Sequence, residues 1–131
     1  MKGECLCRRV AITMSGRPEW MNACNCALCW KLGTLWAYLP GAEVAVTGET
    51  GRYRREDVAQ NHIDAHFCAR CGTTTHWTPI DPDGDRVGIN MRLFDPADLI
   101  GVEVRYEDGR HDPGPDKRHY RPATTFDGAG A

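Results

Sequence analysis

The sequence has few large aliphatic and aromatic residues with which to build an apolar core. Leucine, isoleucine, valine and phenylalanine together make up only 22 of its 131 residues. Such scarcity is typical of disordered chains when the net charge is also high, but here the formal net charge is only −2. The length corresponds to about one domain. We therefore expect a folded domain that something besides an apolar core helps to hold together.

The sequence also lacks the features of membrane, secreted and nucleic-acid-binding proteins. Its longest apolar stretch, residues 35–39, is far too short to span a bilayer. Residues 1–10 contain no apolar segment of the kind found in signal peptides. Acidic and basic residues are interspersed, so no basic stripe is available to bind nucleic acid. These absences predict a cytoplasmic protein with no membrane or nucleic-acid partner.

What the sequence does have is cysteine, in three tight groups. The groups are Cys5-x-Cys7, Cys24-x-Cys26-x2-Cys29 and Cys68-x2-Cys71. An odd number of cysteines without a secretion signal argues against a disulfide framework. A redox dithiol at Cys68 and Cys71 would lack the usual βαβ surroundings and would leave the other cysteines unexplained. Metal binding, with zinc the favoured ion, explains all seven as ligands rather than core residues.

The seven sulfurs divide naturally into four and three. The group of Cys24, Cys26 and Cys29 is compact enough for its sulfurs to reach one ion unaided. The flanking pairs then combine into a four-thiolate site made of Cys5, Cys7, Cys68 and Cys71. Zinc with four protein ligands is structural, whereas three protein ligands leave a position for water or substrate. We therefore expect two zinc ions per chain, one structural and one open.

Two alternatives to this assignment stay open at the level of the sequence. One alternative is a histidine as the fourth ligand of the second site. The candidates are His62, His66 and His76, with His111 and His119 less suited because they lie in a polar tail. Iron in place of zinc at the four-thiolate site is the other alternative.

The rest of the chain is typical of short strands separated by turns. Strands are predicted over residues 10–14, 19–23, 34–39, 44–47, 53–55, 63–67, 73–78, 86–91 and 102–106. One or two helical turns are predicted over residues 27–32, ended by Gly33, and a short turn over residues 96–99. The predicted fold is mostly β, with one domain over residues 1–108. Residues 109–131 are rich in Gly, Pro and charge, and we expect a loosely held arm there.

Three cysteine motifs and one later segment occur together in a known pattern. They are Gly3-x-Cys5-x-Cys7, Cys24-x-Cys26-x2-Cys29 with Gly33, Phe67-Cys68-x2-Cys71-Gly72-Thr73, and Val87-Gly88-Ile89-Asn90-Met91 with Asp95-Pro96. Together they resemble the glutathione-dependent formaldehyde-activating enzyme family, which includes centromere protein V. The resemblance covers roughly residues 3–100.

The resemblance implies a β-tent fold of several small, curved antiparallel sheets with two zinc sites. It implies a structural zinc at Cys5, Cys7, Cys68 and Cys71, and a catalytic zinc at Cys24, Cys26 and Cys29. The family's founding activity condenses formaldehyde with glutathione to S-hydroxymethylglutathione, which is a carbon–sulfur lyase reaction in reverse. We therefore expect a lyase-like enzyme for a small thiol or thiol adduct, with glutathione as one candidate. The alternative is a non-catalytic, zinc-stabilised binding module.

The sequence departs from the family pattern at the rim of the open site. Members often carry His where this chain has Asn25, Ser in place of Ala27, and Arg in place of Trp30. Other residues near the cysteines are candidates for contact with a substrate. Lys31, Arg70 and Arg92 are candidates for holding a carboxylate, and Trp30 and Trp77 for forming pocket walls.

Overall fold

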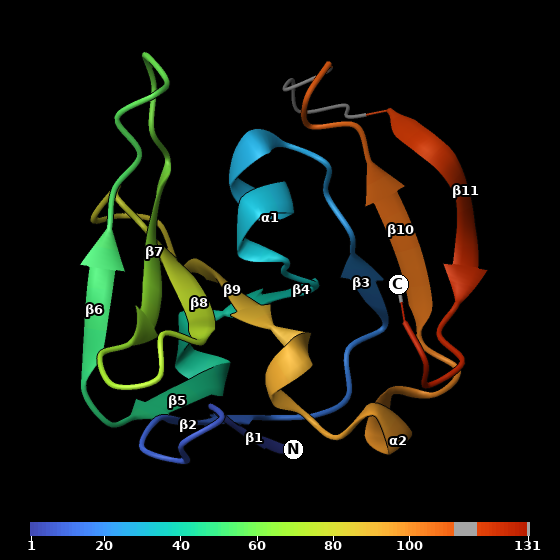
Figure 1. Cartoon of the computed structure of the whole chain (residues 1–131), viewed down its shortest axis with the longest axis horizontal. Coiled ribbons are helices and arrows are strands. Elements are labelled where there is room, and N and C mark those ends of the chain that lie inside the picture. Colours follow the sequence, from blue (N-terminus) through green and yellow to red (C-terminus); the bar gives the residue numbers. More distant parts are fainter. Residues whose placement is uncertain (112–117, 131) are drawn as a thin grey trace.

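The strands of the chain form two sheets, as the computed structural model in Figure 1 shows for residues 1–111 and 118–130. The smaller sheet has the order β1-β2-β5, from Lys2–Glu4, Ala11–Met14 and Val44–Thr47. The larger sheet has eight strands in the order β11-β10-β3-β4-β9-β8-β7-β6. The predicted mostly-β class is confirmed, but the expectation of several small sheets is wrong, because strands from both halves of the chain join one large sheet.

The larger sheet contains most of the described strands. Its strands are β3 (Trp20–Asn22), β4 (Trp36–Pro40), β6 (Thr50–Tyr53), β7 (Ile63–Cys68), β8 (Thr74–Pro79), β9 (Arg86–Asn90), β10 (Glu103–Glu107) and β11 (His119–Thr125). The helices are α1 (Ala27–Leu32) and α2 (Pro96–Leu99), with 3₁₀ turns η1 (Gly41–Glu43) and η2 (Met91–Leu93). In Figure 1, α1 lies in front of the middle of this sheet, with β6 to β8 on one side and β3, β10 and β11 on the other.

One strand pair corrects the expectation of purely antiparallel sheets. Strand β10 runs parallel to β3, with Val104 opposite Met21. Parallel neighbours need a long connection instead of a tight turn, and here the connection includes most of the chain. Local turn signals therefore could not predict the pair. The pairing brings the end of β10 beside the segment that follows β3, where Cys24 and Cys26 lie.

Several predicted elements are confirmed at their predicted bounds. They are α1 over Ala27–Leu32, β5 over Val44–Thr47 and α2 over Pro96–Leu99. Helix α1 ends at Gly33, whose φ of 64° is in the left-handed region that glycine adopts without strain. Its first turn is capped by the Cys26 sulfur, which accepts a hydrogen bond from the backbone N–H of Cys29. Strand β1 was not predicted, since its three residues include no large apolar side chain.

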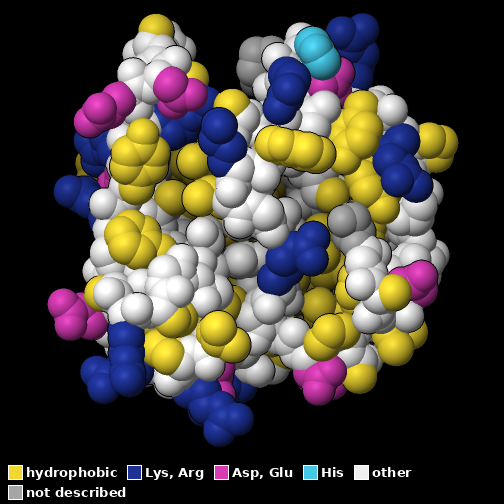
Figure 2. Space-filling view, viewed as in Figure 1, with side chains coloured by type: hydrophobic (Ala, Val, Ile, Leu, Met, Phe, Trp, Pro, Cys, Tyr) yellow, Lys and Arg dark blue, Asp and Glu magenta, His cyan; other side chains and the backbone are white. Residues whose placement is uncertain are grey.

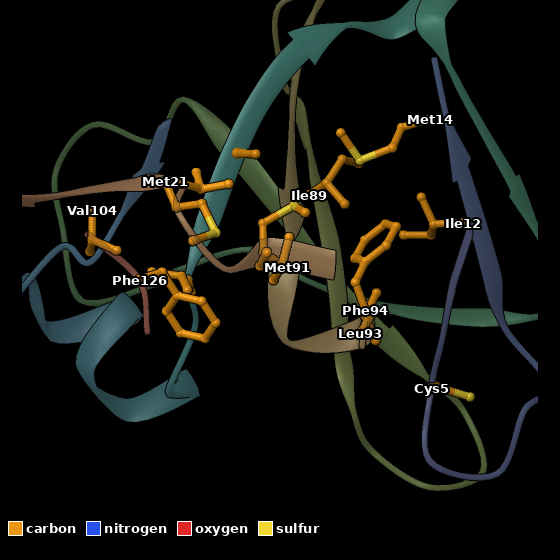
Figure 3. Packing of buried hydrophobic residues seen from close by; sticks show 14 of the residues in the cluster. Cys5, Ile12, Met14, Met21, Ile89, Met91, Leu93, Phe94, Val104 and Phe126 are labelled. Carbon is orange, nitrogen blue, oxygen red and sulfur yellow. The ribbon is translucent and has the colours of Figure 1, made fainter. Parts of the chain in front are cut away.

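The buried core is built partly from residues outside the aliphatic count. Met14, Met21 and Met91 are all at most 2% exposed, and Figure 3 shows them spread through the core. Methionine is flexible enough to fill irregular gaps. Cys5 and Cys68 also belong to this core. The expectation that cysteines lie outside the core is therefore wrong for these two, which are core residues and also belong to a cluster that could hold a metal ion.

The C-terminal segment is also more ordered than predicted. Residues His119–Thr125 form β11, which pairs with β10, and Phe126 is 6% exposed within the core. The backbone N–H of Phe126 donates to the carbonyl of Val102. The prediction of a loosely held arm is wrong for these residues, because one aromatic side chain anchors a segment whose composition is otherwise polar. Residues 112–117 of the predicted arm lie outside the described part of the chain.

None of the helices that the structure describes has the length and apolar character needed to cross a bilayer.

Candidate metal centres

The first cysteine cluster joins the N-terminal loop to the β7–β8 hairpin. We call it the four-cysteine cluster, and it consists of Cys5, Cys7, Cys68 and Cys71, whose sulfurs all lie within 4.8 Å of one another. The Cys7 sulfur is 3.6 Å from both the Cys5 and the Cys68 sulfur. Four convergent sulfurs are the donor set of closed, tetrahedral zinc sites. The geometry therefore fits a metal ion held entirely by this chain.

Backbone and hydroxyl groups surround these sulfurs with hydrogen-bond donors. The N–H of Val10 donates to the Cys5 sulfur at 3.3 Å, and the N–H of Arg70 to the Cys68 sulfur at 3.4 Å. Hydrogen bonding from the Thr73 hydroxyl lowers the pKa of Cys71 to about 5. Donors directed at sulfur favour the thiolate, which is the form that binds metal. In the turn between β7 and β8, these hydrogen bonds therefore favour the thiolate form of the cysteines in the absence of a metal ion.

The second cluster lies between β3 and the first turn of α1. We call it the three-cysteine cluster, and it consists of Cys24, Cys26 and Cys29, whose sulfurs also lie within 4.8 Å of one another. All three residues are partly exposed. Among the residues that the structure describes, no histidine or carboxylate joins this set. Three protein ligands are typical of metal sites that keep one position for water or substrate.

The sulfurs of the three-cysteine cluster influence one another strongly. Hydrogen bonding from the neighbouring thiols of Cys24 and Cys29 lowers the pKa of Cys26 to about 2. Hydrogen bonding with Cys26 raises the pKa of Cys24, hydrogen bonding with Cys24 and then Cys26 raises the pKa of Cys29, and burial adds to both effects. The cluster thus holds one anionic sulfur readily and resists ionising the other two. A divalent cation would remove that resistance, because a coordinating thiol is deprotonated by the metal.

Trp36 supports the three-cysteine cluster from β4, a role that the sequence analysis missed. Its indole Nε1–H donates to the Cys29 sulfur at 3.2 Å, and its side chain is 2% exposed. Such donors orient metal ligands and tune their basicity. The only sequence signal was a tryptophan seven positions after a cysteine, which points equally to ordinary packing.

A pocket of about 200 Å³ opens beside the three-cysteine cluster. Its lining residues are Ala23, Cys24, Cys29, Trp30, Gly33, Thr34, Arg92 and Tyr120. Figure 2 shows hydrophobic and basic side chains next to one another on this face of the molecule. The pocket thus combines two cysteine ligands, aromatic walls and a cation.

Two of the side chains that the sequence proposed for substrate contact line this pocket, namely Trp30 and Arg92. The others lie elsewhere. Arg70 lines a different cavity, beside Cys68. Trp77 packs against Tyr38, with ring centroids 5.9 Å apart. Lys31 is exposed and does not line the pocket of the three-cysteine cluster.

The candidate histidines do not complete either cluster in the described part of the chain. His66 and His76 stack on each other with ring centroids 4.3 Å apart. His111 contacts Asp108 at 2.9 Å, while His62 and His119 are exposed. The alternative of a histidine as the fourth ligand is therefore not supported by this geometry.

Asn22 and Thr34 each have one buried polar atom that makes no hydrogen bond. Among the described residues, the buried side-chain atoms without a hydrogen-bond partner are Asn22 Oδ1 and Thr34 Oγ1. Asn22 precedes Cys24 by two positions, and Thr34 lines the pocket. Buried polar groups are normally satisfied. These two atoms are therefore exceptions among the described residues, and one of them belongs to a residue that lines the pocket, Thr34.

Comparisons with known proteins concern the fold and the family of this chain. A crystal structure of a Rhodobacter sphaeroides protein, a structural genomics target, is similar to this chain with a TM-score of 0.59 and 23% identity. The similarity covers 72% of this chain and 88% of that one and concerns the fold alone. No curated protein matches the chain. The sequence profile of the glutathione-dependent formaldehyde-activating enzyme family matches residues 1–107, which include every cysteine. The chain therefore belongs to the glutathione-dependent formaldehyde-activating enzyme family.

Proposed function

We propose that this protein is a zinc-dependent carbon–sulfur lyase-like enzyme acting on a small thiol adduct, similar to S-hydroxymethylglutathione synthase. One observation carries the proposal. Three convergent cysteine sulfurs lie beside an open pocket, and no other described metal-ligating side chain joins them. Family membership supports the reaction class.

The residues of the three-cysteine cluster fit zinc by their chemistry. Cys24, Cys26 and Cys29 would hold the ion, which supplies a positive charge that favours the thiolate form of a bound thiol and polarises a carbonyl oxygen. Trp36 and the backbone N–H of Cys29 hold two of the sulfurs in place. Arg92 lies where it can attract a substrate carboxylate.

The proposed reaction needs little beyond alignment of its two partners. The substrate sulfur bonds to the aldehyde carbon, the carbonyl π electrons move to oxygen, and the thiol proton ends on that oxygen. In the lyase direction the same bond breaks and the aldehyde is released. The pocket walls hold both partners close together, which is a large part of what an enzyme supplies for a two-substrate reaction.

The four-cysteine cluster completes the proposal as a structural zinc site, giving two zinc ions per chain. Cys5, Cys7, Cys68 and Cys71 would tie the N-terminal loop to the hairpin of β7 and β8. A cytoplasmic location agrees with this assignment, because reduced thiols persist in that compartment.

The test combines zinc analysis with an assay for the adduct. Elemental analysis of the purified chain should give about two zinc ions, and Cys26→Ser should give about one while staying folded by circular dichroism. The wild type should cleave a hydroxymethyl thiol adduct and release formaldehyde, and the variant should not. A variant that unfolds, together with a wild type inert toward every adduct, would instead support the non-catalytic binding module.

A further inference from the structure

The three-cysteine cluster contacts a segment of the chain that lies beyond the family match. The family profile ends at residue 107. Glycine at position 109 lies so close to the cluster that a Cβ there would come within 2.6 Å of the Cys24 sulfur. Real Cβ atoms do not approach other atoms so closely, so a larger residue at this position would have to displace the Cys24 sulfur. The segment after β10 therefore forms one side of the cluster.

Asn25 fastens this segment to the cluster. Its side-chain Nδ2 donates to Asp108 Oδ1 at 2.8 Å, and its Oδ1 accepts from the backbone N–H of Arg110 at 3.1 Å. The Arg110 Nε–H also donates to the Asn25 carbonyl, at 3.2 Å. Asn25 lies between two of the cysteine ligands, at the position where family members often carry histidine. In this chain it links the ligand loop to residues outside the family match.

Strand β11 then returns to the same place and contributes Tyr120. The register between β10 and β11 shifts between Tyr106 and Glu107, whose partners are Arg121 and His119. Tyr120 is thus the extra residue of a β-bulge, a feature that re-aims a side chain and is frequent beside active sites. Tyr120 lines the pocket together with Cys24 and Cys29.

The Tyr120 ring is held in a defined position. Its hydroxyl donates to the carbonyl of Ala23 at 3.3 Å, and its ring meets that of Tyr106 edge to face with centroids 5.7 Å apart. Trp30 lines the same pocket from α1. The space that remains is about 200 Å³, whereas sites for drug-sized ligands measure about 300–1,000 Å³. The pocket is thus small for a tripeptide.

We infer that Tyr120, contributed by a strand outside the family match, is a specificity-determining residue that limits the pocket to compact thiols and their adducts, smaller than glutathione. The inference rests on the proposed function, because it concerns the thiol that the three-cysteine cluster would accept. Tyr120 would form a wall of the pocket and would take no part in the chemistry.

Calorimetric binding of three thiols to the zinc-loaded chain tests the inference. The probes are 2-mercaptoethanol, cysteine and glutathione, with zinc content measured after each titration. We expect the wild type to bind the two small thiols at least about tenfold more tightly than glutathione, the scale at which pocket shape discriminates ligands. Tyr120→Ala should reduce that ratio at least about fivefold by improving glutathione binding.

Two further variants separate the pocket wall from general effects on the fold. Tyr120→Phe keeps the ring and should keep the wild-type ratio. Tyr53→Ala removes a tyrosine of similar exposure, 48% against 46%, that does not line the pocket, and it should also keep the ratio. If Tyr120→Ala still binds thiols but keeps the wild-type ratio of affinities for small thiols and glutathione, the inference about Tyr120 is wrong. The proposed function would be unaffected by that result. If no thiol binds to any of these proteins, the proposed function itself fails.

Discussion

The two cysteine clusters use the same ligand and similar N–H···S support, yet their surroundings differ. In the four-cysteine cluster, Cys5 and Cys68 are buried within the core and link the N-terminal loop to β7. In the three-cysteine cluster every ligand is partly exposed, and a pocket lies alongside. The clusters thus differ in the number of sulfurs that converge and in the burial of two of them, Cys5 and Cys68, although the residue type is the same.

The largest expected effect comes from breaking the four-cysteine cluster. Cys68→Ser removes a buried ligand, and because metal binding energy is also folding energy, the free energy of unfolding should fall by about 5 kcal/mol or more. Domains of this size have about 5–15 kcal/mol in total. Circular dichroism should show that the variant is already unfolded at 37 °C and has no cooperative thermal transition.

The matched control for Cys68→Ser is Cys26→Ser in the open cluster. Its unfolding transition should remain cooperative, since Cys26 lies at the start of α1, outside the core. The reverse outcome, with Cys26→Ser unfolded and Cys68→Ser intact, would exchange the roles of the two clusters.

A smaller effect should follow from removing the indole donor of the open cluster. Trp36→Phe keeps a buried aromatic ring but loses the hydrogen bond to the Cys29 sulfur. Loss of such a supporting contact weakens metal binding by about 10–100-fold. Titration with a zinc chelator should show earlier release of one zinc ion while the other is released as in the wild type. Equal weakening of both ions would indicate general loosening of the fold.

The smallest effect concerns the acid sensitivity of the β7–β8 hairpin, which contributes two cysteines to the four-cysteine cluster. Burial lowers the pKa of His76 to about 4 from an ordinary value of 6.5. The unfolded chain therefore takes up this proton at higher pH than the folded chain. The contribution of neutral His76 to stability is present above about pH 6.5 and is lost as the pH falls toward 4.

His76→Gln removes that titration. Between pH 7.5 and 5.5, the free energy of unfolding of the wild type should fall by about 1 kcal/mol more than that of the variant. Denaturant unfolding at the two pH values measures the difference, and effects of pH on the thiolates cancel in the comparison. Parallel pH dependence in the two proteins would show that His76 does not cause the acid sensitivity.

Much of the local structure and both clusters followed from local sequence. Spacing within each cysteine group and the glycine after α1 predicted the grouping of sulfurs and the bounds of the helix, because these features depend on a few neighbouring residues. Three methionines in the core escaped a count of aliphatic residues, although their burial contributes as much as that of leucine. The C-terminal strand was not predicted because its composition is polar. The one phenylalanine that anchors this segment, Phe126, is not marked as buried by its local sequence.

The surroundings of the open cluster could not be predicted in this way. Trp36, Gly109 and Tyr120 reach it from different strands and loops, and nothing in their local sequence marks them as neighbours of a cysteine. The parallel pairing of β3 with β10 brings two of these segments to the ligands. Such pairing is decided by long-range packing, for which a local pattern has no signal.

The sequence by itself determined the ligand type, the division of sulfurs into four and three and the family, because metal ligation by short cysteine loops is a local property of the chain. The tertiary structure alone decided that Cys5 and Cys68 are buried in the core and that a pocket lined by Cys24 and Cys29 lies beside the other cluster. It also decided what surrounds that pocket, because walls are formed by side chains distant in sequence whose positions depend on how the sheet folds as a whole.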